Sequence, residues 1–174
     1  MSTRWMRDYL KYDSLAWDDV SEGDELPAAV REVDATLVVV GAIASRDLYP
    51  VHHDRDVAQR SGAPDVFMNI LTTNGLVGRY VTDWAGPGAR LVDVDIRLGA
   101  PNYPGDTMVM RGRVTEVDRV SGTVVVGLRG SNRIGDHVTG VVRLVLPAPG
   151  APAPADSAGS GRNGTSNDGH EERT

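Results

Sequence analysis

Residues 64–84 read PDVFMNILTTNGLVGRYVTDW, and this stretch decides the fold class. Its large apolar side chains recur at spacings of three, four and seven residues, which places them in one stripe along a predicted helix: Val66, Phe67, Ile70, Leu71, Val77, Val81 and Trp84. Gly86-Pro87-Gly88 ends this helix, because proline and glycine interrupt helical hydrogen bonding. Gly75 and Gly78 lie inside it. Each costs up to about 1 kcal/mol relative to alanine, so we expect other backbone, most simply a sheet, to approach closely there.

The sequence after this helix predicts an antiparallel sheet. Residues 91–98 alternate between aliphatic and mostly charged side chains, which is the period-two pattern of a strand with one face in water. Further strands are predicted over residues 107–118, 123–131 and 137–146. Gly122 and Gly135 lie in the turns between them, where glycine supplies the positive φ that tight turns require. These patterns indicate an α+β domain in which a curled antiparallel sheet wraps one long helix.

Residues 36–45 are ambiguous. The run Leu37-Val38-Val39-Val40 favours a strand by propensity, whereas Asp34 or Thr36 at its start is a typical helix cap. From these residues alone, both assignments remain open.

Composition limits the class of protein. The chain has 174 residues and a mass of 18.6 kDa, enough for one domain with a real core. It contains no cysteine, which excludes disulfides, thiolate catalysis and cysteine-ligated metals. A net charge of −6 argues against nucleic-acid binding. No run of 18 apolar residues and no signal-peptide pattern is present, so we expect no membrane partner and a cytoplasmic protein.

Three segments are expected along the chain. Residues 1–16 form an N-terminal extension whose aromatic side chains should pack on the domain or on a partner, and residues 17–146 form the folded domain. Residues 147–174 are rich in proline, alanine, glycine and serine and hold almost no large apolar side chain, so we expect a disordered tail.

The most informative motif for chemistry is residues 46–54, RDLYPVHHD. It presents a carboxylate, Asp47, five residues before an imidazole, His52, with Pro50 stiffening the turn between them. Such a pair can share one water molecule, because the carboxylate orients it and the imidazole takes its proton. The alternative is that Asp47 caps a helix and the histidines are solvated loop residues.

This motif resembles the signature of the MaoC-like hydratases, also called (R)-specific enoyl-CoA hydratases, which have the hot-dog fold. That signature is Asp-x-Asn-Pro-aliphatic-His followed after five residues by a small residue, here residues 47–52 with Ala58. Tyr49 stands where the signature has asparagine, and its larger ring would change the shape of the mouth of the site. Residues 98–107, LGAPNYPGDT, are similar to the family's loop between strands, and residues 17–27 to its lead-in to the first strand. The resemblance implies a sheet of five or six strands around residues 64–84, and a short helix over residues 36–45.

The resemblance also implies an activity. Asp47 and His52 would activate a water molecule that adds syn across the double bond of a trans-2-enoyl-CoA. No cofactor is implied besides the CoA that the substrate carries, and no metal. The family places a His-Gly pair at the start of the central helix as a backbone donor to the enolate oxygen, but here Phe67-Met68 stands there. We therefore expect the Met68 N–H and the Asn69 side-chain amide to bind the substrate; the bland alternative is that Phe67 and Met68 are core residues.

A finer likeness concerns the substrate and the partner. Residues 46–54 and 67–73 look most like an actinobacterial branch that includes the small subunit of a steroid side-chain enoyl-CoA hydratase. This implies either a homodimer or a hetero-oligomer with a second MaoC-like subunit. Two other functions remain open: a hot-dog thioesterase, and a non-catalytic subunit that binds an acyl-CoA.

The remaining polar candidates carry weaker expectations. His53 and Asp54 lack a third metal ligand, and His137 at a strand start is expected to be structural. Arg111 and Arg113 share one strand face, where they either meet CoA phosphates or, as we favour, form a solvated surface.

Overall fold

The structure is a computed structural model that describes residues 14–150. The expectations for residues 1–13 and for the tail from residue 151 onward concern parts of the chain outside this range. Trp17, the first residue of the expected domain, is partly buried against the core, and its backbone N–H donates to the carbonyl of Pro147. The start of the expected domain therefore packs against its end.

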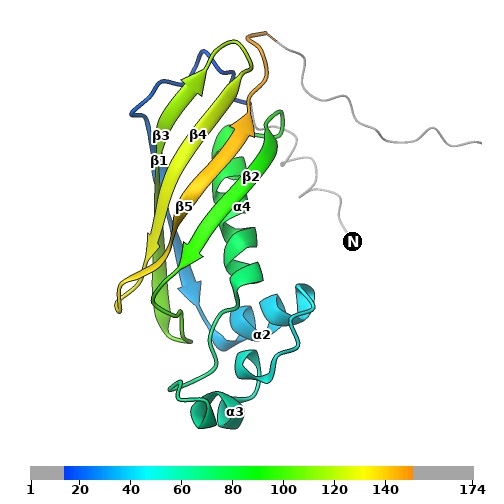
Figure 1. The fold of residues 1–174 in the computed structure, drawn as a ribbon, viewed down its shortest axis with the longest axis vertical. Coiled ribbons are helices and arrows are strands. Elements are labelled where there is room, and N and C mark those ends of the chain that lie inside the picture. Colours follow the sequence, from blue (N-terminus) through cyan, green and yellow to red (C-terminus); the bar gives the residue numbers. More distant parts are fainter. Residues whose placement is uncertain (1–13, 151–174) are drawn as a thin grey trace, which may run out of the picture.

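A five-stranded antiparallel sheet forms the main layer, in the order β1-β3-β4-β5-β2 (Figure 1). Its strands are β1 (Glu25–Val33), β2 (Arg90–Leu98), β3 (Asp106–Asp118), β4 (Thr123–Ser131) and β5 (Asp136–Val145). The strands predicted after the helix are confirmed to within one residue at each end. β2 lies at one edge and pairs with β5, and its Leu91, Val92 and Leu98 are exposed.

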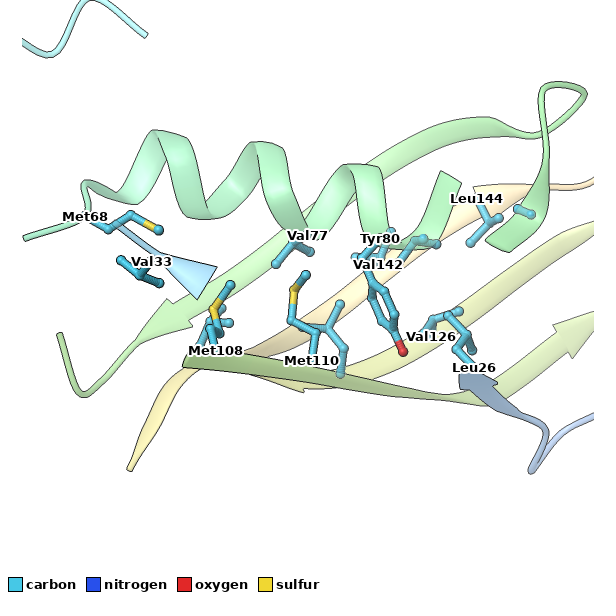
Figure 2. Packing of buried hydrophobic residues seen from close by; sticks show 14 of the residues in the cluster. Leu26, Val33, Met68, Val77, Tyr80, Met108, Met110, Val126, Val142 and Leu144 are labelled. Atoms are coloured by element: carbon cyan, nitrogen blue, oxygen red, sulfur yellow. The ribbon is translucent and has the colours of Figure 1, made fainter. Parts of the chain in front are cut away.

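One long helix, α4 (Ile70–Ala85), packs along the face of this sheet and builds the core (Figures 1 and 2). Val77 and Val81 of α4 are fully buried, and Val77 faces the methionine side chains of β3 (Figure 2). Each such side chain removed from water stabilises the fold by roughly 1.5–3 kcal/mol. This arrangement of one helix and a curled sheet confirms the expected hot-dog architecture.

The predicted start of the central helix was wrong. The helix begins at Ile70 rather than at residue 64, because Asn69 is extended and its side-chain oxygen accepts the N–H of Thr72 as an N-cap. The apolar residues of 64–68 imitate helical spacing while lying in a loop, and Val66 and Met68 reach the core from there. Ile70 and Leu71, placed in the buried stripe by the spacing, are about half exposed.

The glycines of α4 do not mark a close approach of backbone. A Cβ at Gly75 would meet no other atom within 4 Å, and at Gly78 it would make an ordinary contact with Leu91 at 3.6 Å. The close approach occurs at Gly41 instead, where a Cβ would collide with the side chain of Thr72. Gly41 therefore allows a second helix to cross the first turn of α4.

That second helix is α2 (Ala35–Ala44), which confirms the helix that the resemblance implied for residues 36–45. Its N-cap is Asp34, whose carboxylate accepts the N–H of Leu37 at 2.6 Å. The short helices η1 (Pro50–His52) and α3 (Arg55–Arg60) follow it, so the segment between β1 and α4 forms a small helical layer at one end of the sheet (Figure 1). Among the described helices, none is long and apolar enough to cross a membrane.

Candidate active site

Asp47 is positioned by the end of α2. The N–H of Asp47 donates to the carbonyl of Ala42 at 2.9 Å, and the N–H of Arg46 donates to that of Ile43 at 3.0 Å. This is a Schellman motif, with Arg46 in its left-handed position at φ 58°. A left-handed non-glycine residue costs roughly 1–2 kcal/mol, so the turn that presents Asp47 is strained.

His52 is positioned by η1 and by the loop before α4. Pro50 occupies the first position of η1, where its fixed φ favours the turn, and the His52 ring is only 7% exposed. Its Nδ1 lies 2.7 Å from the carbonyl oxygen of Phe67. A carbonyl can only accept, so Nδ1 carries the hydrogen and Nε2 of the neutral ring is left as an acceptor.

The two side chains meet as the spacing of the motif predicted. His52 Nε2 lies 3.4 Å from Asp47 Oδ2, and the Asp47 side chain remains 25% exposed. The carboxylate and the unprotonated ring nitrogen therefore face the same space, which is open to solvent on the side of Asp47. This arrangement suits a water molecule that is oriented by one group and deprotonated by the other.

Asn69 contacts the pair directly, in a way that differs from the expectation. Its Nδ2 donates to Asp47 Oδ2 and to Ser45 Oγ, each at 2.9 Å, while its Oδ1 caps α4. The amide from Asn69 is the main cause that lowers the pKa of Asp47 below 3.8; burial opposes it, and the Tyr49 N–H and the His52 charge add to it. The Asn69 amide, expected to bind substrate, is thus engaged with the carboxylate of Asp47 and the hydroxyl of Ser45.

Met68 is a core residue whose N–H is already satisfied. Its side chain is 2% exposed, and its N–H donates to the carbonyl of Asn102 at 3.0 Å. The N–H that was expected to donate to a substrate oxygen therefore has a partner in the loop between β2 and β3. Residues 67–69 instead hold the pair: Phe67 binds His52, Asn69 binds Asp47, and Met68 between them is anchored to Asn102.

Aromatic rings surround His52. The Phe67 ring lies edge-to-face with it at a centroid distance of 5.1 Å, and the Tyr49 ring at 6.4 Å. Tyr103 extends this cluster beyond Phe67 at 6.3 Å. Phe67 and Tyr103 are partly buried, whereas Tyr49 is 64% exposed.

The other candidates lie apart from the pair. His53 is exposed, and no three metal-ligating side chains of residues 14–150 come together. Arg111 and Arg113 are exposed on the sheet face opposite α4, where they and Arg129 line an open hollow of about 710 Å³. This hollow lies at the start of β1, about 20 Å along the strand from the end that leads into α2. The favoured interpretation of a solvated surface agrees with this placement.

His137 is buried in the interior, at the start of β5. It is 1% exposed, its Nδ1 lies 2.7 Å from the Ala100 carbonyl, and its Nε2 lies 2.8 Å from Thr73 Oγ1. These contacts tie the loop after β2 to α4, which is consistent with the structural role expected of it.

Three contributors to the site were missed from sequence. Ser45, the Phe67 carbonyl and Asn102 each hold a group of the site. Backbone carbonyls leave no trace in residue identity, so Phe67 and Asn102 had no sequence signal. Ser45 had one: it lies two residues before Asp47, at the expected end of a helix.

Comparison with known proteins identifies the family. A family model described as "MaoC like domain" matches residues 23–132. The 3-oxo-4,17-pregnadiene-20-carboxyl-CoA hydratase beta subunit of Mycobacterium tuberculosis is 48% identical over 124 residues, which cover 71% of this chain and 95% of that protein.

Solved structures agree with this assignment. A chain of the ChsH1–ChsH2 complex from Mycobacterium tuberculosis superposes with a TM-score of 0.71 at 46% identity, covering 74% of this chain and 99% of that one. The R-hydratase PhaJ1 from Pseudomonas aeruginosa gives the same TM-score at 19% identity, and the match covers 78% of this chain and 87% of the PhaJ1 chain. At this identity the likeness shows a shared fold. The chain therefore belongs to the MaoC-like family.

Proposed function

We propose that this protein hydrates a trans-2-enoyl-CoA thioester to the 3-hydroxyacyl-CoA, with Asp47 and His52 as its catalytic residues. The observation that carries the proposal is the pair itself: His52 Nε2 faces Asp47 Oδ2 at 3.4 Å, and both groups are held by residues 67–69. Family membership and the name of the 48% identical relative support a hydratase.

The reaction follows from the protonation states of the pair. Asp47 is an anion at neutral pH, since the Asn69 amide lowers its pKa, and it orients the water molecule by accepting one of its hydrogens. His52 Nε2 takes the other hydrogen as the water oxygen bonds to Cβ of the substrate. The electron pair of the double bond moves toward the thioester, and the proton on His52 then passes to Cα. Every atom of the water ends in the product, so the step needs neither a metal nor a cofactor beyond the CoA that the substrate carries.

The developing enolate oxygen needs a donor that is free. The first N–H groups of a helix have no partner inside it, and the positive end of the helix dipole lies at the same place. Helix α4 begins at Ile70, directly after the three residues that hold the pair. The N–H groups of Thr72 and Thr73 donate to Asn69, so we assign the enolate oxygen to the backbone N–H groups of Ile70 and Leu71, in place of the Met68 N–H.

The substrate class and the partner are part of the proposal. The name of the relative specifies a steroid-derived carboxyl-CoA with a double bond in the 17-position and calls the protein a beta subunit, and the matching structure is a two-component complex. We infer a bulky polycyclic enoyl-CoA as substrate and a second MaoC-like subunit as partner. A cytoplasmic location is part of the same proposal, since the substrate is a CoA thioester.

The test is the loss of enoyl thioester absorbance. Purified protein is mixed with crotonyl-CoA and, separately, with 3-oxo-4,17-pregnadiene-20-carboxyl-CoA, first alone and then with an added second MaoC-like subunit. Turnover that depends on Asp47 supports the proposal, and the more efficient substrate defines the class. Absence of turnover under all four conditions contradicts it.

A further inference from the structure

Tyr49 lies in the turn of residues 47–52, which we call the catalytic turn. Its backbone binds Asp47, whereas its side chain is mostly exposed. Its N–H lies 3.3 Å from Asp47 Oδ1, which helps to orient the carboxylate. The phenol ring is 64% exposed and touches the turn only edge-to-face, at 6.4 Å from the centroid of His52. Replacing the ring therefore keeps the N–H that holds Asp47.

The place of this ring is unusual for an exposed aromatic side chain. It stands beside the polar pair, on a turn whose backbone Pro50 stiffens. Leu48, the preceding residue, is 67% exposed. The exposed face of Tyr49 is thus an apolar surface at the edge of the site.

The reaction places the acyl group next to this surface. Cβ of the substrate must come within bonding reach of the water held by Asp47 and His52. The part of the acyl group beyond Cβ must therefore lie against a residue next to this pair. Phe67, the other ring in contact with His52, is partly buried and already packed on Tyr103. Of the two rings, that of Tyr49 is the one left mostly exposed.

We propose that Tyr49 is a specificity-determining residue, whose ring packs against the rigid polycyclic part of the acyl group. This inference rests on the proposed function. A short acyl group ends before it reaches the ring, whereas fused rings extend across it. Contact of one exposed aromatic ring with an apolar surface is worth about 1–2 kcal/mol, which corresponds to a five- to thirtyfold preference.

The experiment measures a ratio of specificity constants. The kcat/KM for 3-oxo-4,17-pregnadiene-20-carboxyl-CoA is divided by the kcat/KM for crotonyl-CoA. Both constants are measured either on the protein alone or with the added second subunit, whichever is active for the wild type. In Tyr49→Ala this ratio falls at least fivefold, and in Tyr49→Phe, which keeps the ring, it falls less than twofold. The matched control is Leu48→Ala, an equally exposed apolar residue of the same turn, in which the ratio changes less than twofold. A smaller fall in Tyr49→Ala, or an equal fall in Leu48→Ala, overturns the inference.

A binding measurement separates this inference from the proposed function. In the Asp47→Asn background hydration is slowed about 100-fold or more, so rapid mixing reports the dissociation constant of the thioester before much of it is consumed. Adding Tyr49→Ala weakens the binding of the polycyclic thioester at least fivefold more than that of crotonyl-CoA. Equal weakening of the two overturns the role of Tyr49, whatever the outcome of the activity assay.

Discussion

His52 and His137 are held in the same way and serve different purposes. The Nδ1 of each lies 2.7 Å from a backbone carbonyl, that of Phe67 for His52 and that of Ala100 for His137, so both rings carry their hydrogen on Nδ1. The difference is at Nε2. His52 Nε2 faces a partly exposed carboxylate, whereas His137 Nε2 accepts from the buried hydroxyl of Thr73 at 2.8 Å.

The comparison separates two requirements for a general base. Fixing the tautomer is necessary, and both sites do it, but a base must also leave its acceptor nitrogen free for substrate or water. At His137 the hydroxyl of Thr73 occupies that nitrogen. Burial lowers the pKa of the His137 ring below 6.5, although the Ala100 carbonyl and the Asp106 charge act in the opposite direction. His137 therefore stays neutral and contributes to packing.

The largest predicted effect is on turnover at His52. His52→Asn keeps a side-chain N–H for the Phe67 carbonyl and removes Nε2, so kcat should fall about 100- to 10,000-fold, the usual range for a general acid–base group. Asp47→Asn should have a similar effect, because the oriented water loses its anionic acceptor. Steady-state kinetics gives kcat, and thermal unfolding shows that both variants remain folded. A His52→Asn protein with more than a tenth of wild-type kcat would contradict the comparison.

The second effect is on stability at His137. His137→Ala removes a buried ring and its bonds to the Ala100 carbonyl and the Thr73 hydroxyl, which should cost about 3 kcal/mol of unfolding free energy and roughly 10 °C in Tm. Urea denaturation measures this cost. Thr73→Val should lose part of the same energy and Thr73→Ser should retain most of it. If His137→Ala lowered kcat more than His52→Asn, then His137 rather than His52 would be the general base, which would contradict the comparison.

A smaller effect is expected at Asn69. Asn69→Ser keeps a cap for α4 and removes the amide that binds Asp47, so kcat should fall about tenfold. The pKa of Asp47 should rise at the same time, because its main lowering contact is lost. Carbon-13 NMR titration of the Asp47 carboxyl measures this pKa, and an unchanged value would show that the amide does not control the carboxylate.

The smallest effect is a pH dependence of stability. Because burial lowers the pKa of His137 in the folded state, the unfolded chain binds the proton at higher pH. The contribution of His137 is therefore fully present above its unfolded pKa of about 6.5 and is lost as the pH falls below that value. Urea unfolding between pH 8 and pH 5 should show a steeper loss in the wild type than in His137→Gln. Parallel curves would mean that the buried ring is not kept neutral.

The parts of the molecule that were predicted from sequence are those encoded locally. Asp47 and His52 are five residues apart on one turn, so their meeting follows from the motif. The alternation and turn glycines of residues 107–131 gave strands β3 and β4 almost to the residue. Helix α2 required the family resemblance, because the propensity of its valines favours a strand.

What was mispredicted depends on contacts between distant segments. The apolar residues of 64–68 have helical spacing, but the Asn69 cap and the bond from Met68 to Asn102 hold them in a loop. Distant contacts also involve Met68 and Asn69, which were expected to bind substrate: the Met68 N–H donates to Asn102, and the Asn69 amide donates to Asp47. Composition and spacing do not reveal such partners.

The segment between β1 and α4 has a consequence for how this protein evolves. Residues 45–69 supply both side chains of the proposed catalytic pair and the polar groups that contact them, while the described strands contribute no side chain to the pair. Mutations of the sheet and mutations of the chemistry are therefore largely separable. The fold persists at 19% identity in the Pseudomonas aeruginosa hydratase. Within such a lineage, a duplicated copy can lose its catalytic turn, keep its sheet, and remain useful as the companion of an active one.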